Sequence, residues 1–241
     1  MRVLILSDIH SNLTAFEAVL SDAGHFEKTI CLGDVVGYGP DPEECVRLLL
    51  GLPNLVCIMG NHDAAVLNVI STGHFNPEAR KALHQQKNLM SDEALEFLAS
   101  LPEKLTFGDL TLAHGSPRDP IWEYVDKGRI AWEVFEYFET QGTLVGHTHT
   151  PCIFIESEDF KMRLLKPKSG DRWIPKERFI LNPGSVGQPR DHDPRASYVI
   201  WDTEENSFLF KRVHYNISEV ANRIQQRGIP SLQAKRLSLG R

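Results

Sequence analysis

The chain begins with Val3-Leu4-Ile5-Leu6-Ser7-Asp8-Ile9-His10, four consecutive apolar residues followed by an aspartate and a histidine. A short continuous apolar run is typical of a strand that is buried on both faces. Two similar runs follow, residues 28–32 before Gly33-Asp34 and residues 55–58 before Gly60-Asn61-His62-Asp63. The intervening residues 13–20 and 41–50 have the pattern of helices, the first capped by Ser11. Buried strands that alternate with helices indicate an α/β fold.

The second half of the chain is richer in predicted strands. Residues 64–100 are expected to be mainly helical, and residues 105–107 and 110–113 flank Gly108-Asp109 as in a hairpin. Further strands are predicted at residues 144–145, 152–155, 162–165, 179–181, 197–201 and 208–213, and a helix at residues 218–226. We find no repeat and no linker, so residues 1–241 are predicted to form a single domain with two packed sheets.

Two charged segments stand apart from this pattern. Residues 156–178 carry many charges of both signs and are expected to form an exposed hairpin or edge, a surface through which two copies could pair into a homo-oligomer. Residues 228–241 lack acidic side chains and are expected to form a frayed basic tail, with phosphate or partner binding as the alternative.

The composition is that of a soluble globular protein. Of the 241 residues, 41% are hydrophobic and 24% charged, and the net charge of −6 argues against extended nucleic-acid binding. No apolar run approaches the roughly 18 residues of a membrane span or the core of a signal peptide. The four cysteines form no C-x-x-C pair, and three of them lie in apolar runs, which favours buried free thiols over disulfides. We therefore expect a cytoplasmic protein without a membrane partner.

Polar side chains that can bind metals follow the predicted strands. Asp8 and His10 share one face if the chain is still extended there, and His147 and His149 have the same spacing. Ligands bind beyond the carboxyl ends of the strands in an open α/β sheet. The candidate ligands are two carboxylates, one carboxamide and four histidines, namely Asp8, His10, Asp34, Asn61, His114, His147 and His149.

Seven ligands are too many for one metal ion, but they suit two ions that share a bridging carboxylate. The set offers nitrogen and oxygen and no thiolate. It therefore suits manganese, iron, zinc, nickel or magnesium in a catalytic site better than a structural zinc ion, and manganese is our first expectation. Each motif alone is a weak signal, because an H-x-H pair or an aspartate after a strand is more often structural. The glycines beside these positions allow the close backbone approach that a crowded site requires.

Taken together, these motifs resemble the calcineurin-like metallophosphoesterase superfamily. The resemblance covers residues 8–149, and Asn182-Pro183-Gly184-Ser185 extends it towards a compact prokaryotic phosphodiesterase branch. It implies a two-sheet sandwich flanked by helices. It also implies that Asp8, His10 and His149 hold one metal, that Asn61, His114 and His147 hold the other, and that Asp34 bridges them.

The same resemblance implies catalytic roles for His62 and Asp63. His62 would protonate the leaving group and Asp63 would orient it, or His62 is a structural neighbour of the metals. Two metals neutralise the phosphoryl oxygens and acidify a bridging water, whose hydroxide then attacks phosphorus.

The substrate contacts are less defined by the sequence. Protein phosphatases of the superfamily carry G-D-x-x-D-R-G, but Gly37 and Tyr38 stand here in place of the Asp-Arg pair, which puts a protein substrate in doubt. Arg118 and Arg190 are the candidates for phosphate contacts, with surface positions as the alternative. Tyr38, Trp122 and Tyr124 either stack on a nucleobase or form the walls of the pocket, and His192 is a candidate for its rim.

We therefore predict a metal-dependent phosphodiesterase that acts on small or nucleotide phosphate esters. Hydrolysis of dinucleoside polyphosphates or of phosphomonoesters is the alternative within the enzyme class. A catalytically silent binding scaffold is the alternative outside it, although such a scaffold can lose ligands and all seven are present here. A DNA-processing nuclease is disfavoured, because the chain is acidic and has no basic stripe.

Overall fold

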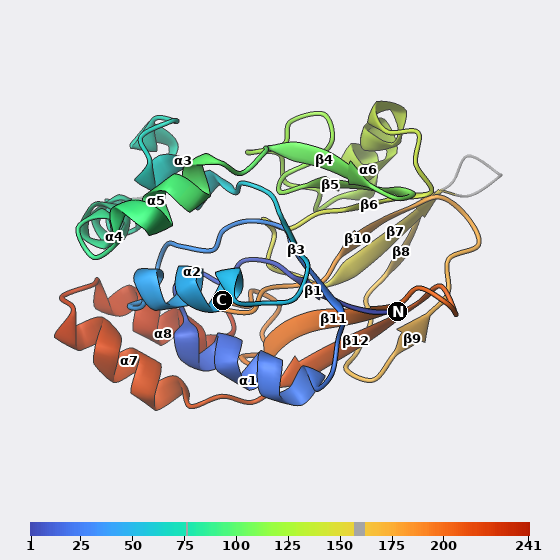
Figure 1. The fold of residues 1–241 in the computed structure, drawn as a ribbon. Coiled ribbons are helices and arrows are strands. Elements are labelled where there is room, and N and C mark those ends of the chain that lie inside the picture. The colour runs from blue at the N-terminus through green and yellow to red at the C-terminus, as the bar shows by residue number, and fades with distance from the viewer. Residues whose placement is uncertain (76, 157–161) are drawn as a thin grey trace.

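The computed structural model describes residues 1–75, 77–156 and 162–241 (Figure 1). In the first half of the chain the elements are β1 (Arg2–Leu6), α1 (Leu13–Ala23), β2 (Lys28–Cys31), α2 (Pro42–Leu50), β3 (Leu55–Cys57), α3 (Asn61–Val66), the 3-10 turn η1 (Thr72–His74), α4 (Pro77–Lys87), α5 (Asp92–Ala99), β4 (Lys104–Phe107) and β5 (Leu110–Ala113). In the second half they are α6 (Gly128–Val134), the 3-10 turn η2 (Phe135–Tyr137), β6 (Gly142–Leu144), β7 (Cys152–Glu156), β8 (Met162–Leu165), β9 (Arg172–Trp173), β10 (Phe179–Asn182), β11 (Ala196–Asp202), β12 (Ser207–Val213), α7 (Ile217–Gln226) and α8 (Ser231–Leu239).

The strands of the described chain form two mixed sheets of six strands each. The first has the order β3-β2-β1-β11-β12-β9 and the second the order β4-β5-β6-β10-β7-β8. In the first sheet β1, β2 and β3 are parallel, and in the second β5, β6 and β10 are parallel. The two sheets pack face to face, with helices on their outer faces (Figure 1). This confirms the predicted two-sheet α/β sandwich flanked by helices.

Strand β1 shows how the sequence builds these layers. Its side chains alternate between the two faces of the sheet. Val3 and Ile5 pack between the sheets against residues of the second sheet, whereas Leu4 and Leu6 pack against the helices α1 and α2. All four are fully buried, as the continuous apolar run predicted. The carboxyl end of β1 is thus held firmly at the edge where the candidate metal ligands begin.

Several local predictions differ from the structure. The side chain of Asn12, not of Ser11, caps helix α1 by accepting a hydrogen bond from the backbone N–H of Ala15. Helix α6 and the short strand β9 were not predicted, because α6 has only seven residues and β9 only two.

The prediction of a frayed tail over residues 228–241 is wrong for the helix α8. Ile229 and Leu237 are buried and pack against Val220 and Ile224 of α7, and this apolar contact outweighs the solvation of the basic side chains. Gln233 on the same helix is also buried. The terminal helices therefore form a packed hairpin (Figure 1).

The charged segment 156–178 is described only in part. Residues 157–161, at the tip of the predicted hairpin, lie outside the described residues. On either side of them β7 and β8 pair antiparallel, and β8 is an edge strand with three of its four residues exposed.

The cysteines match the prediction of free thiols. All four, Cys31, Cys45, Cys57 and Cys152, are free and buried. Among the helices of residues 1–75, 77–156 and 162–241, none is long and apolar enough to span a bilayer.

Candidate metal centre and catalytic cleft

The seven predicted ligands come together at one edge of the sandwich. The loop after β1 carries Asp8 and His10, the loop after β2 carries Asp34, and Asn61 is the first residue of α3, which follows β3. The loops after β5 and β6 carry His114, His147 and His149. Each of the seven is at most 3% exposed. Because parallel strands end at a common edge, the two sheets bring side chains that lie far apart in the sequence into one cluster.

The backbone at these loops is not extended, so the condition under which Asp8 and His10 would share one face of a strand is not met. Their φ angles are 55° and 50°, and those of Asp34, His147 and His149 are 54°, 64° and 59°. This left-handed region is uncommon for residues other than glycine, and it concentrates at functional sites. The two-residue spacing therefore brings side chains together through tight turns and not through strand alternation.

The cluster has two parts that share Asp34. In the first part, ligand atoms of Asp8, His10, Asp34 and His149 lie within 4.8 Å of one another. His149 Nε2 is 3.1 Å from Asp8 Oδ1, and His10 Nε2 is 3.5 Å from Asp34 Oδ2.

The second part consists of Asp34, His114 and His147, whose ligand atoms also lie within 4.8 Å of one another. His114 Nε2 is 3.3 Å from Asp34 Oδ2 and 3.1 Å from Asn61 Oδ1. The same carboxylate oxygen of Asp34 therefore faces both parts, as a bridging ligand would.

Three ligand atoms of this cluster are buried without a hydrogen-bond partner among the described residues. They are Asp8 Oδ1, Asp34 Oδ2 and His147 Nε2. A buried polar atom left unpaired costs about 1–3 kcal/mol. Three such atoms lie together in this cluster, and bound cations would supply the partners that they lack. The residues present therefore fit the two metal ions that the motifs imply.

Hydrogen bonds behind the cluster fix the histidine rings. The Nδ1–H groups of His10, His114 and His149 donate to the main-chain carbonyls of Val36, Leu32 and Gln188, at 3.0, 2.8 and 2.6 Å. Each ring therefore carries a proton on Nδ1 and turns its Nε2 atom towards the cluster.

The pKa shifts in the cluster also favour the protonation states that bind metal ions. Burial opposes the charge of Asp8 and Asp34, but the neighbouring histidines outweigh it and lower the pKa of both carboxyls. Burial lowers the pKa of His149 and lowers that of His147 to about 3. The carboxylates are thus charged at neutral pH and these histidines are neutral.

His114 differs in its ionisation. Burial lowers its pKa, but the nearby charge of Asp34 prevails and raises the pKa to about 10. Without a metal, His114 is therefore the cation that balances Asp34. Coordination would replace that proton with a metal ion.

Two glycines give the ligands room. A Cβ at Gly60 would lie 2.1 Å from Asp34 Oδ1, and one at Gly146 would lie 2.1 Å from Ser7 Oγ and 3.0 Å from Asp8 Oδ2. Any side chain at either position would displace a carboxylate of the cluster or its hydrogen-bond partner.

His62 lies beside the cluster as predicted, but Asp63 does not orient it. The buried ring of His62 packs edge-on against His10 at 4.8 Å and Phe75 at 4.9 Å, and burial lowers its pKa to about 4. Its Nδ1 has no hydrogen-bond partner among the described residues.

The Asp63 carboxylate accepts hydrogen bonds from three backbone N–H groups, those of Asp34, Val36 and Gly60. Burial and the charge of Asp34 raise its pKa to about 7. Asp63 therefore positions the loop that carries Asp34. This role was not predicted, because two of the three amide partners, those of Asp34 and Val36, lie 29 and 27 residues away along the chain.

A cleft of about 100 Å³ opens onto the cluster. Its walls are mainly aromatic, and its lining consists of Asp34, Tyr38, Asn61, His62, Phe75, Trp122, Tyr124, His147, His149 and Arg190. Sequence reasoning did not identify Phe75, which has no distinguishing motif and reaches the cleft only through the packing of the segment after α3.

The structure brings one of the two candidate arginines to the cleft. Arg190 lines it, and its guanidinium donates to the Tyr38 hydroxyl at 3.3 Å and to Gln188 Oε1 at 3.1 Å. Arg118 is instead paired with Glu123 and with Glu133, the latter at 2.9 Å, and does not line the cleft. The prediction for Arg118 is therefore wrong, because nearby carboxylates bind its guanidinium.

The three aromatic candidates differ in exposure. Tyr38 is 8% exposed and packs against His10 and His62, so it forms a wall. Trp122 is partly buried and packs against Phe75. Tyr124 is 45% exposed and stacks on His147 with a centroid distance of 3.9 Å.

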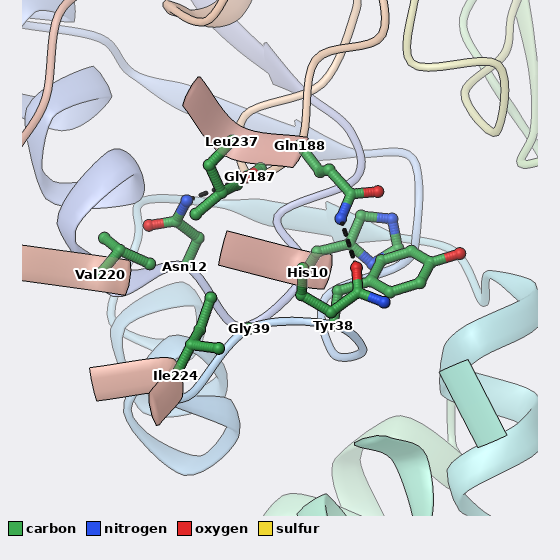
Figure 2. A pocket seen from close by; sticks show the side chains of 10 residues that line it. His10, Asn12, Tyr38, Gly39, Gly187, Gln188, Val220, Ile224 and Leu237 are labelled. Atoms are coloured by element: carbon green, nitrogen blue, oxygen red, sulfur yellow. Dashed lines mark hydrogen bonds between the residues drawn. The ribbon is translucent and has the colours of Figure 1, made fainter. Parts of the chain in front are cut away.

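The terminal helices α7 and α8 lie next to the cluster. Figure 2 shows Val220 and Ile224 of α7 and Leu237 of α8 around a small cavity that His10 and Tyr38 also line. Gln188, whose carbonyl binds His149, donates through its side chain to Gln233 of α8 at 3.0 Å.

Two further residues of the C-terminal region were placed by the structure. Arg236 of α8 lies over the Tyr38 ring at 5.9 Å. His192, the rim candidate, is exposed and accepts a hydrogen bond from Arg241, away from the residues that line the cleft.

Solved structures provide the first comparison with known proteins. A metallophosphoesterase from Sphaerobacter thermophilus is 44% identical, with a TM-score of 0.92 over 100% of this chain and 99% of that chain. A hypothetical protein from Pyrococcus horikoshii is 21% identical and shares the fold, with a TM-score of 0.78 over 100% of this chain and 98% of that one.

Sequence comparison leads to the same group. An uncharacterized protein from Methanocaldococcus jannaschii is 38% identical over 99% of this chain and 98% of its own length. The family model of the calcineurin-like phosphoesterase superfamily domain matches residues 1–206. With the strand-end ligands gathered as the motifs predicted, the chain belongs to the calcineurin-like phosphoesterase superfamily.

Proposed function

We propose that the protein hydrolyses phosphate esters with two bound metal ions and prefers small or nucleotide phosphodiesters. Membership of the superfamily supports phosphoester hydrolysis as the reaction class. The observation that carries the proposal is the position of Asp34. Its Oδ2 lies 3.5 Å from His10 Nε2 and 3.3 Å from His114 Nε2, between the two parts of the cluster.

Asp8, His10 and His149 would hold one ion, Asn61, His114 and His147 the other, and Asp34 both. When bound, two such ions offset the negative charge of the phosphoryl oxygens and lower the pKa of water towards about 7. The donor set of nitrogen and oxygen supports manganese first, with iron, zinc, nickel or magnesium as the other candidates.

The chain's own residues bind the ester and supply a proton. Arg190 lines the cleft and can hold a phosphoryl oxygen through its guanidinium. His62 lines the same cleft as a neutral ring, since burial lowers its pKa to about 4. A ring N–H of His62 can therefore donate to the oxygen of the leaving group, which becomes negatively charged as the ester bond breaks. Asp63 keeps the loop of Asp34 in place through its three amide contacts.

An activity screen after metal reconstitution tests the proposal. The purified protein is stripped with a chelator, loaded with Mn²⁺ and assayed on bis-p-nitrophenyl phosphate, p-nitrophenyl phosphate, cyclic nucleotides and dinucleoside polyphosphates. We expect Mn²⁺-dependent turnover, with the diester favoured over the monoester. A preference for the monoester would make the protein a phosphomonoesterase. No metal-dependent turnover on any substrate would contradict the proposal and indicate a binding scaffold.

We also propose that the protein works in a reducing compartment, the cytoplasm. The support is that all four cysteines are free and buried, although Cys31 and Cys57 are direct partners on neighbouring strands.

A further inference from the structure

The catalytic cleft is small for the substrate that it is proposed to act on. Its volume is about 100 Å³, whereas pockets that enclose whole organic ligands measure roughly 300–1,000 Å³. The space above the cluster therefore suits the phosphoryl group. The organic part of a phosphate ester must extend beyond it.

A larger groove adjoins the cleft on the side of Tyr124 and Arg190. Its volume is about 330 Å³, and these two residues line both the groove and the cleft. We call it the outer groove; its other lining residues are Val125, Asp126, Thr148, Thr150, Cys152, Phe154, Leu164 and Lys166. A group attached to a phosphate in the cleft can thus continue directly into it.

The floor of the outer groove is an apolar surface on strands β7 and β8. Phe154 and Leu164 are direct cross-strand partners, so their side chains share one face of the second sheet. Leu164 is 43% exposed on this face. Its neighbour Leu165 is 39% exposed but pairs with Ile153 and does not line the groove. Leu164 therefore offers apolar surface to a ligand that enters the groove.

The wall of the outer groove is a half-exposed aromatic ring. Tyr124 stacks on His147 at 3.9 Å and stands between the cleft and the groove. The edges are polar. Asp126 and Lys166 lie there, and the described part of the chain gives neither of them an ion-pair partner. An aromatic wall, an apolar floor and polar edges together suit a flat heterocycle with a hydroxylated sugar.

We propose that the outer groove binds the nucleoside part of a nucleotide whose phosphate lies at the metal cluster. The placement of that phosphate rests on the proposed function. Arg190, at the junction, would contact the phosphate, and Tyr124 with Leu164 would contact the base or sugar. The groove thereby selects nucleotide esters over simple phosphate esters.

Calorimetric titration of the Mn²⁺-loaded protein tests this proposal. The probes are inorganic phosphate and the non-hydrolysable phosphonate analogues of ribose 5-phosphate and of AMP. We expect the AMP analogue to bind about tenfold more tightly than the other two, a gain of about 1.4 kcal/mol, because only its base can stack on the Tyr124 ring. Equal affinity for all three probes would overturn the proposal.

Two neighbouring leucines supply a matched pair of variants. L164E places a charge in the groove, and L165E places the same charge on the adjacent residue outside it. We expect L164E to reduce the affinity for the AMP analogue to that for the ribose 5-phosphate analogue, and L165E to leave it unchanged. Equal losses in both variants, with unchanged melting temperatures, would contradict a specific groove.

The same proteins separate this proposal from the proposed hydrolysis. If no substrate is turned over but the AMP analogue still binds more tightly and responds to L164E, the hydrolase proposal fails and the groove stands. If bis-p-nitrophenyl phosphate is hydrolysed but the three probes bind equally, the groove proposal fails alone.

Discussion

The metal-ligand cluster and the outer groove are neighbours, yet the chain builds them in opposite ways. The cluster consists of seven buried side chains at the ends of strands, fixed by left-handed turns and main-chain hydrogen bonds. The groove is formed by β7, the edge strand β8 and the segment around Tyr124, and its Leu164 and Tyr124 side chains are half-exposed. Changes in the cluster should therefore abolish the reaction, and changes in the groove should alter only which ester is accepted.

The largest effect is expected for Asp34→Asn. This change removes the negative charge that faces both parts of the cluster, so one variant weakens two metal sites at once. We expect Mn²⁺-dependent hydrolysis of bis-p-nitrophenyl phosphate to fall by about 10³-fold or more, because stabilisation worth several kcal/mol is lost. Asp92→Asn, at an exposed position on α5, is the matched control and should retain full activity. A tenfold loss or less would argue against a shared ligand.

Replacing His62, which lines the cleft beside the cluster, should reduce activity less than Asp34→Asn does. For His62→Ala we expect kcat to fall by about 10²–10⁴-fold, the usual contribution of a general acid. The bound Mn²⁺ should stay as in the wild type, since His62 is not one of the predicted ligands. Esters with better leaving groups should lose less, because their oxygen needs no proton. If all esters lost equally, or if metal were lost, His62 would have a structural role.

Arg190 lies where the cleft and the outer groove meet, and Arg118 serves as its counterpart away from both. Arg190→Ala should lower kcat/KM by about 10–100-fold through the loss of a charge-assisted hydrogen bond to phosphate. Arg118→Ala should change kcat/KM less than about twofold, because its bonds to Glu123 and Glu133 lie on the surface. Comparable losses in both variants would contradict a phosphate contact made by Arg190.

The contrast between the two regions also explains what the sequence could predict. Asp8, Asp34 and Asn61 were found because each comes within four residues of the end of a strand, and parallel strands must end at a common edge. The fold class followed from the same apolar runs. These signals are local, so they can be recognised in the sequence without knowledge of tertiary contacts.

Other features depend on contacts between distant segments and were missed. Helix α8 was predicted to fray because its basic residues mask a buried Leu237 and Gln233, whose partners lie on α7 and at Gln188. The amide contacts of Asp63 and the pairing of Arg118 are equally invisible in the sequence. The outer groove could not be predicted without the register of β7 and β8, because this register places Leu164 and not Leu165 on its floor.

The most direct test of the account is the metal stoichiometry of the protein. After chelation and reconstitution with Mn²⁺, elemental analysis of the desalted protein should find two ions per chain. The spin coupling of a shared-ligand pair should also appear in its electron paramagnetic resonance spectrum. One ion per chain, or two without coupling, would contradict a centre in which Asp34 joins two metals.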